Sequence, residues 1–179
     1  NLKKRGEFLA RYFASFQAWD KPGTVYQAID PVDIFTGSLK DWPEFLAKLA
    51  NWRARFSHCP SAKAFGYFGY DGSVYFAAYP QVFLLESPQD SPLWRSLAEA
   101  AATPSVGEIK SNWSREGFMR AVVETQEHIL RGEVYQVNIA QHFSAPFRGD
   151  TLPVFSRLLA VSPAPGMAYL DAGNTVLLS

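Results

Sequence analysis

The sequence predicts an α+β fold built from antiparallel sheets with helices outside them. Segments with strand-like alternation occur in clusters joined by hairpin signals, and segments with helical spacing fall between these clusters. Apolar residues make up 47% of the 179 residues, which is enough for a sizeable core and unlike the composition of a disordered chain. A chain of this length fits one domain or part of a larger one.

In the first quarter of the chain, residues 7–19 fit either a helix or a strand, and Thr24 to Ile29 are predicted to form a short strand. Asp41 to Ser57 are predicted to form a helix. Asp41 and Glu44 have the spacing of a capping box, and Pro43 falls in the first turn. Its apolar stripe would consist of Phe45, Leu49, Trp52 and Phe56.

A β-hairpin is predicted over residues 64–79. Its turn would be the two-residue sequence Asp71-Gly72, with both residues at positive φ. Val82 to Glu86 are predicted to add a third, neighbouring strand.

The second half should contain three helices. Ser91 and Pro92 open one that runs to about Ala102, and residues 103–111 are expected to be a connector. Ser114 to Arg131 form the strongest predicted helix, with Ser114 as its cap and Gly132 just past its end. Its buried stripe would be Phe118, Val122, Thr125 and Ile129. A short helix over 152–161 and a hairpin across Asp171 to Asn174 complete the prediction.

The sequence RGEVYQVNIAQHF, Arg131 to Phe143, alternates like a half-buried strand. One predicted face is apolar, and the other holds Gln136, Asn138 and His142. This polar face fits a solvated sheet surface as well as the lining of a cavity inside a sheet sandwich, with Gln136 and Asn138 as lining residues.

The loop SPAPGM, Ser162 to Met167, is a second candidate site. Two prolines and a glycine make it rigid and leave room for a ligand. It is a turn at least, and it could form one wall of a small-molecule pocket.

Charge and composition exclude several classes of function. The 17 basic and 17 acidic residues balance, so there is no basic excess of the kind that nucleic-acid-binding proteins show. We find no apolar run near the roughly 18 residues of a membrane span. One cysteine, Cys59, excludes an internal disulfide and favours a cytoplasmic protein. Three histidines and this cysteine lack metal-ligand spacing.

Three blocks resemble the chorismate-utilising enzymes, which include aminodeoxychorismate synthase component I and anthranilate synthase component I. They are FGYFGYD (residues 65–71), ILRGEVYQVNIAQHF (129–143) and SPAPGMAYLDAG (162–173), and they stand in the family's order. The form of the third block and the compact first half are more similar to the aminodeoxychorismate branch. The alternatives are anthranilate synthase component I and a non-catalytic ligand-binding α+β domain.

The resemblance implies that residues 1–179 are the N-terminal part of a single larger chorismate-binding domain with an antiparallel sheet sandwich. The whole enzyme would aminate chorismate at C4, with ammonia from a glutamine amidotransferase subunit, on the route to 4-aminobenzoate and folate. Its catalytic lysine and Mg²⁺ ligands are expected downstream of Ser179, so no catalytic or metal-binding residue is assigned here and the fragment alone should be inactive. The third block implies a tryptophan pocket at Pro165, Gly166 and Met167, although Gly166 replaces the family's usual aromatic residue.

Overall fold

The computed structural model describes residues 14–17, 24–86, 95, 103–162, 164 and 166–179. They belong to two compact units, which we describe one at a time. The first unit comprises the described residues before 102 together with residues 151–179, and the second comprises residues 103–150.

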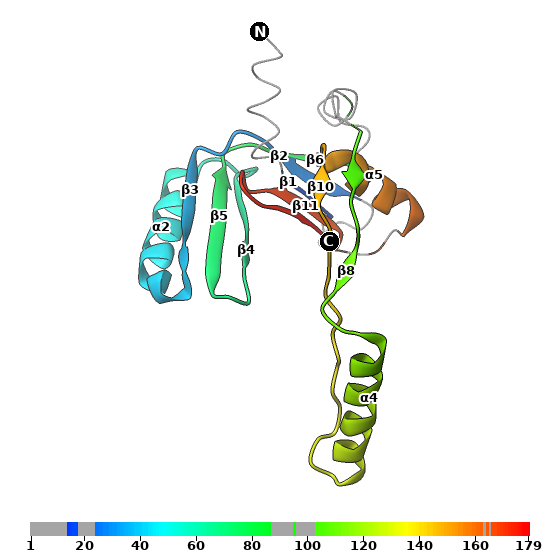
Figure 1. The fold of residues 1–179 in the computed structure, drawn as a ribbon. Coiled ribbons are helices and arrows are strands. Elements are labelled where there is room, and N and C mark those ends of the chain that lie inside the picture. Colours follow the sequence, from blue (N-terminus) through cyan, green and yellow to red (C-terminus); the bar gives the residue numbers. More distant parts are fainter. Residues whose placement is uncertain (1–13, 18–23, 87–94, 96–102, 163, 165) are drawn as a thin grey trace. The chain divides into compact units, whose positions relative to one another are not determined.

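The first unit contains two antiparallel sheets (Figure 1). One has the strand order β12-β11-β1-β2-β6, and the other has the order β3-β5-β4. The five strands of the larger sheet are β1 (Ala14–Gln17), β2 (Val25–Ala28), β6 (Val82–Leu85), β11 (Ala168–Asp171) and β12 (Val176–Leu178). The smaller sheet consists of β3 (Asp33–Ser38), β4 (Lys63–Phe68) and β5 (Ser73–Tyr79).

Alternation along β5 explains how this unit is layered. Tyr75 and Tyr79 belong to a core cluster that also contains Leu170 of the larger sheet, so the two sheets pack against each other. Val74 and Ala78 point the other way, into a cluster with the helix α2 (Trp42–Arg55). The helix α5 (Leu152–Val161) packs on a further cluster with residues of β11 and β12. This arrangement confirms the predicted α+β class of antiparallel sheets with flanking helices.

The helix predicted over 41–57 is present as α2, but its start differs from the prediction. A 3-10 turn, η2 (Leu39–Asp41), precedes it. The Asp41 carboxylate accepts hydrogen bonds from the Ser38 amide (2.7 Å) and hydroxyl (3.1 Å), so the capping box joins Ser38 and Asp41. The predicted capping pair of Asp41 and Glu44 is wrong, because the Asp41 carboxylate bonds Ser38 at the start of η2 instead. In the stripe, Phe45 and Trp52 are buried, whereas Leu49 is exposed.

The hairpin β4–β5 is confirmed, but its turn is one residue longer than predicted. The Gly69 amide bonds the Ser73 carbonyl, and the Gly72 amide bonds the Gly69 carbonyl. Only Gly72 has positive φ, at 83°, so Tyr70, Asp71 and Gly72 form a three-residue loop instead of a two-residue turn.

The strand β6 exists as predicted but does not neighbour this hairpin. It pairs with β2 in the larger sheet, from Val25 opposite Leu85 to Ala28 opposite Val82.

The second unit is a narrow antiparallel ribbon that leads into a helix (Figure 1). β7 (Ser105–Val106) pairs with β10 (Phe147–Arg148), and β8 (Lys110–Ser111) pairs with β9 (Phe143–Ser144). The predicted connector over 103–111 therefore contains two short strands. The helix α4 (Arg115–Leu130) confirms the strongest predicted helix.

Both predicted ends of α4 are confirmed. The Ser114 hydroxyl accepts a hydrogen bond from the Gly117 amide at 3.0 Å, and Gly132 has φ of 71°. The predicted buried stripe is wrong in degree: Phe118, Val122 and Thr125 are half-buried, and α4 has no buried residue.

The predicted strand over 131–143 is wrong for most of its length. Only Phe143 lies in a strand, as the first residue of β9, and residues 134–142 are not part of any strand. In the described part of the chain no second strand pairs with these residues, so their alternating side chains do not belong to a β-sheet.

The end of the chain agrees with its prediction. α5 has the predicted bounds, and β11 and β12 form the hairpin, with Gly173 at φ of 88° in its turn. Of the ambiguous residues 7–19, residues 14–17 form β1 and the others lie outside the described residues. The helix predicted over 91–102 also lies outside them, except for Arg95. None of the described helices is long and apolar enough to span a membrane.

Candidate functional site

The loop between α5 and β11 holds the predicted ligand-binding residues Pro165, Gly166 and Met167. Pro165 lies outside the described residues. Gly166 is exposed and has φ of 82°, a conformation that favours glycine. A side chain at Gly166 would extend into open space, because nothing lies within 4 Å of the position of its Cβ.

Met167 has a different environment from Gly166. Its side chain is 7% exposed and packs in the core cluster with Leu152, Phe155 and Tyr169. The rings of Phe155 and Tyr169 lie 5.6 Å apart, and the Tyr169 hydroxyl is 2.9 Å from the hydroxyl of Thr151 just before α5. Met167 thus fixes the end of the loop to the core under α5, and its role in ligand binding stays a prediction.

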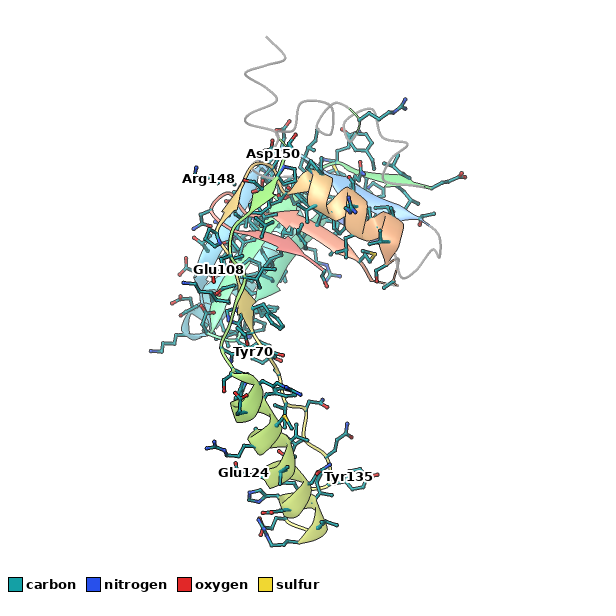
Figure 2. The ribbon with its side chains drawn as sticks, turned by 45° about the vertical axis from the view of Figure 1, so that its right-hand side comes forward. Tyr70, Glu108, Glu124, Tyr135, Arg148 and Asp150 are labelled. Carbon is teal, nitrogen blue, oxygen red and sulfur yellow. The ribbon has the colours of Figure 1, made fainter. Side chains whose placement is uncertain are left out.

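The two predicted cavity-lining residues, Gln136 and Asn138, lie in the second unit, on the chain segment that runs back beside α4 (Figure 2). Both are exposed, and so is Tyr135, which is 96% exposed. The described residues around them form no cavity wall, because only Ile139 of residues 134–142 is even half-buried. Their role as lining residues stays a prediction for an enzyme longer than this chain.

The far end of this segment is anchored to the start of α4. The Trp113 indole donates to the Ala140 carbonyl at 3.1 Å, and the Gln141 side chain donates to the Ser111 hydroxyl at 2.8 Å. The His142 amide donates to the Asn112 side chain, also at 2.8 Å. The segment is therefore held at residues 140–142.

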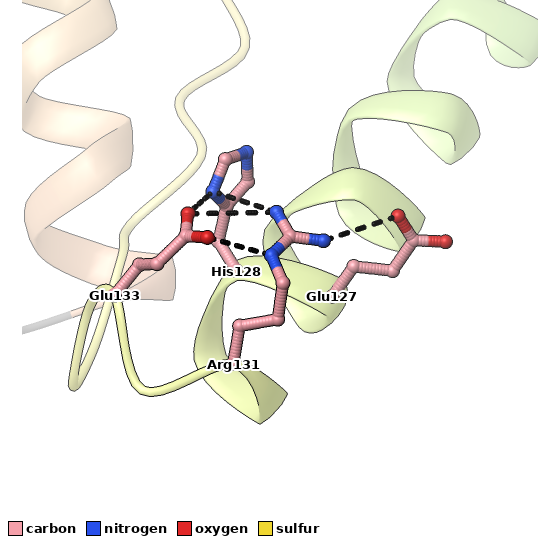
Figure 3. A network of polar contacts seen from close by, with 4 residues as sticks. All are labelled: Glu127, His128, Arg131 and Glu133. Atoms are coloured by element: carbon pink, nitrogen blue, oxygen red, sulfur yellow. Dashed lines mark hydrogen bonds and ion pairs between the residues drawn. The ribbon is translucent and has the colours of Figure 1, made fainter.

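The start of this segment, at residues 132 and 133, is fixed by hydrogen bonds to the last turn of α4. The Gly132 amide bonds the Ile129 carbonyl and the Glu133 amide bonds the His128 carbonyl, which is the Schellman arrangement. Figure 3 shows the side chains that surround it. Arg131 Nε donates to Glu133 Oε1 at 2.6 Å, and His128 Nδ1 lies 2.5 Å from Glu133 Oε2. Sequence analysis identified Arg131 and Gly132 at this helix end but not the network.

The network lowers the pKa of Glu133, first through the hydrogen bond from Arg131 and then through His128. A carboxyl whose pKa is lowered in the folded state stabilises that state above its ordinary pKa, and this contribution is lost as the pH falls through the lowered value. All these side chains are about half exposed. The network therefore sets the direction of the chain after α4, and its exposed ion pairs contribute little to stability.

A second polar cluster ties α2 to the smaller sheet. The Asp33 carboxylate accepts from the Trp52 indole at 2.8 Å and pairs with Lys48 Nζ at 3.0 Å, and Lys48 also donates to the Ile34 carbonyl. These contacts lower the pKa of Asp33, the Trp52 bond most of all, against a smaller opposing effect of burial. No sequence pattern indicates this cluster, because Asp33 and Trp52 are 19 residues apart and only the fold brings the two together.

The core between the sheets contains Tyr79, whose hydroxyl stays protonated near neutral pH. Burial raises the pKa of the Tyr79 hydroxyl, and Tyr75 and Asp171 act in the same direction. Tyr79 is fully buried and forms part of the packing between the two sheets.

Magnesium, which the family resemblance implies, has no ligand set in the described part of the chain. No group of three or more His, Cys, Asp or Glu side chains there is arranged to hold a metal ion. The described residues thus do not fit a Mg²⁺ site.

Comparison with known proteins gives a family match that covers about half of the chain. The family of chorismate binding enzymes matches residues 89–179. Anthranilate synthase alpha subunit 1 of Oryza sativa subsp. indica is 41% identical over 70 residues, 39% of this chain and 12% of the rice protein. Aminodeoxychorismate synthase component 1 of Klebsiella aerogenes is 34% identical over 103 residues, 55% of this chain and 23% of that protein.

A third relative is anthranilate synthase component 1 of Thermus thermophilus. It is 33% identical over 71 residues, 40% of this chain and 15% of that protein. The chain thus spans well under two thirds of the length of these relatives. The family match includes all of α4, the segment after it, α5 and the final hairpin. This chain therefore belongs to the family of chorismate binding enzymes.

Proposed function

We propose that this chain is the N-terminal part of an aminodeoxychorismate synthase component I, which acts on chorismate in the cytoplasm. The observation that favours this branch is the extent of the similarity. The match to the Klebsiella aerogenes aminodeoxychorismate synthase extends over 103 residues, whereas the match to the rice anthranilate synthase subunit extends over 70.

In the proposed reaction, ammonia from a glutamine amidotransferase partner replaces the C4 hydroxyl of chorismate, on the route to 4-aminobenzoate and folate. The described residues would contribute the two-sheet scaffold, the fixed end of α4 and the segment that follows it. Magnesium in the full-length enzyme would neutralise and orient a carboxylate of the substrate. The groups that perform the amination are expected outside residues 1–179.

A second candidate is anthranilate synthase component I, which aminates chorismate at C2 and eliminates pyruvate. The higher identity to the rice anthranilate synthase subunit, 41% against 34%, favours it. Both candidates use the same substrate, so only the product separates them.

The test is to purify the full-length protein and incubate it with chorismate, Mg²⁺ and either ammonia or glutamine plus the amidotransferase subunit. Our proposal predicts a product that keeps the enolpyruvyl group and releases no pyruvate in a lactate-dehydrogenase assay. Fluorescent anthranilate together with one pyruvate per turnover would show the second candidate. If chorismate were not consumed under either condition, both would be wrong, and a ligand-binding domain would remain.

A further inference from the structure

A cleft lies between the C-terminal half of α2 and the strands β4 and β5 of the smaller sheet. Its volume is about 530 Å³, which falls within the range of about 300–1,000 Å³ that is typical of small-molecule sites. The helix side contributes Trp52, Arg53 and Phe56, and the sheet side contributes Ala64 and Ala78. All of these residues belong to the first unit of the chain.

The cleft exists because the sheet presents small side chains to this half of the helix. In the first half of α2, the Phe45 ring packs against the rings of Phe35 and Phe76, at centroid distances of 5.3 and 4.8 Å. In the second half, the sheet residues of the same apolar cluster are Ala64 and Ala78. Because a methyl group does not extend as far as a phenyl ring, the space that is filled at one end of α2 stays open at the other.

Two aromatic side chains give the cleft an apolar wall. Trp52 is 5% exposed, and Phe56 is half-buried. The indole nitrogen of Trp52 is the only hydrogen-bond donor of that side chain, and it is already bonded to Asp33 at 2.8 Å. Trp52 therefore offers the cleft the carbon atoms of its ring and no polar group. Together with the alanine methyl groups, the two rings form a surface that suits an apolar body.

A guanidinium group lies at the rim of this apolar cleft. Arg53 is exposed, and no described residue makes a hydrogen bond or ion pair with its guanidinium. The other basic residue of the lining, Lys63, has its Nζ 4.8 Å from the centre of the Tyr26 ring. None of the described residues that line the cleft is acidic. A guanidinium in this position can bind a carboxylate through two parallel hydrogen bonds.

We propose that this cleft binds a small monocarboxylic acid with an apolar body about the size of one ring. Its carboxylate would pair with the Arg53 guanidinium, and its body would lie against Trp52 and Phe56. This inference does not rest on the proposed function, because the residues that carry it precede residues 89–179, which the family match covers.

Other occupants fit the cleft less well. A purely apolar ligand or protein segment would leave the Arg53 guanidinium without an anion, and a phosphate ester carries more negative charge than one cation balances. A strongly polar ligand would lose its hydrogen bonds to water against the ring of Trp52 and the methyl groups of Ala64 and Ala78. A single carboxylate on an apolar body matches both the rim and the wall.

Titration of the full-length protein with benzoate, followed by saturation-transfer NMR, tests the proposal. We expect saturable binding at low salt with a Kd of about 1 mM or tighter. Benzyl alcohol keeps the ring without the charge, and acetate keeps the charge without the ring, so each should bind at least about tenfold more weakly. Benzoate that does not saturate the protein, or a control ligand that binds as tightly as benzoate, would overturn the proposal.

Two arginine variants locate the bound benzoate. Arg53→Gln removes the cation at the rim and should weaken benzoate binding about tenfold. Arg55→Gln is the matched control, because Arg55 is also exposed on α2 but does not line this cleft, and it should change the Kd by no more than about twofold. Unchanged binding in Arg53→Gln would show that benzoate binds elsewhere, and an equal loss in both variants would show unspecific attraction to charge. Either result would overturn the proposal.

A third variant tests whether the space is open. Ala64→Leu places three more carbon atoms in the cleft, so it should abolish benzoate binding without lowering the Tm of the ligand-free protein. A clearly lower Tm would show that α2 and β4 already fill this space, and the cleft would then not be a binding site. If this variant cannot be purified in folded form, the comparison of Arg53→Gln with Arg55→Gln still decides.

Discussion

Substitution of Met167 by alanine decides whether this residue belongs to the core or to a ligand pocket. In the structure the side chain is 7% exposed and packs against Leu152, Phe155 and Tyr169 under α5. A residue in this position stabilises the fold whether or not a ligand is bound.

The magnitude follows from the burial. Replacing a buried Met by Ala costs about 2–5 kcal/mol, from the lost transfer free energy and from the cavity left behind. Met167 lies at the end of its cluster, next to the exposed Gly166, so the site can partly collapse and we expect about 2–3 kcal/mol. Met167→Leu conserves volume and should cost less than about 1.5 kcal/mol.

The assay is urea unfolding of the full-length protein, followed by tryptophan fluorescence, with calorimetric titration of tryptophan as ligand. Val161→Ala is the matched control, because Val161 is 69% exposed on α5 and should change the free energy of unfolding by no more than about 0.5 kcal/mol. The core assignment would be refuted if Met167→Ala left the free energy of unfolding unchanged and abolished tryptophan binding.

Three further predictions concern local contacts. Trp52→Phe removes the hydrogen bond to Asp33 and should cost about 1 kcal/mol near neutral pH beyond the lost packing. Because this bond lowers the pKa of Asp33, the stabilisation it gives is present above the ordinary carboxyl pKa and is lost as the pH falls through the lowered value. Urea unfolding at neutral pH and at about pH 3 should therefore show that the difference in the free energy of unfolding between Trp52→Phe and the unmodified protein becomes smaller in acid. Ser114→Ala removes the cap of α4 and should speed exchange of the first-turn amides, at a cost of about 1 kcal/mol, whereas unchanged exchange would contradict the cap. Gly132→Ala places a Cβ at φ of 71° and should destabilise the end of α4 by about 1–2 kcal/mol, seen as faster exchange of its last-turn amides, and a neutral result would show that the turn rearranges.

Sequence reasoning succeeded where the determining contacts are local. The ends of α4 follow from Ser114 and Gly132, each of which acts within a few residues of itself. The bounds of α5 and the final hairpin were predicted for the same reason. The family could also be inferred from three blocks of sequence, because such motifs are contiguous.

Sequence reasoning failed where the partner lies far along the chain. The alternation after Arg131 predicted a strand, but alternation fixes only which side chains share a face and does not supply the second strand that a ladder requires. For the same reason β6 was placed beside the wrong hairpin: its own residues specify a strand, and its pairing with β2 depends on how the two sheets pack.

By itself the sequence determined the α+β class, the family and the ends of α4 and α5, since hydrogen bonds within a few residues and the periodicity of apolar side chains set them. Only the tertiary structure decided that Met167 points into the core, that Asp33 bonds Trp52, and that residues 134–140 lie exposed. These features depend on contacts between residues that are far apart along the chain, and a local pattern of residue types does not show which distant residues will be in contact.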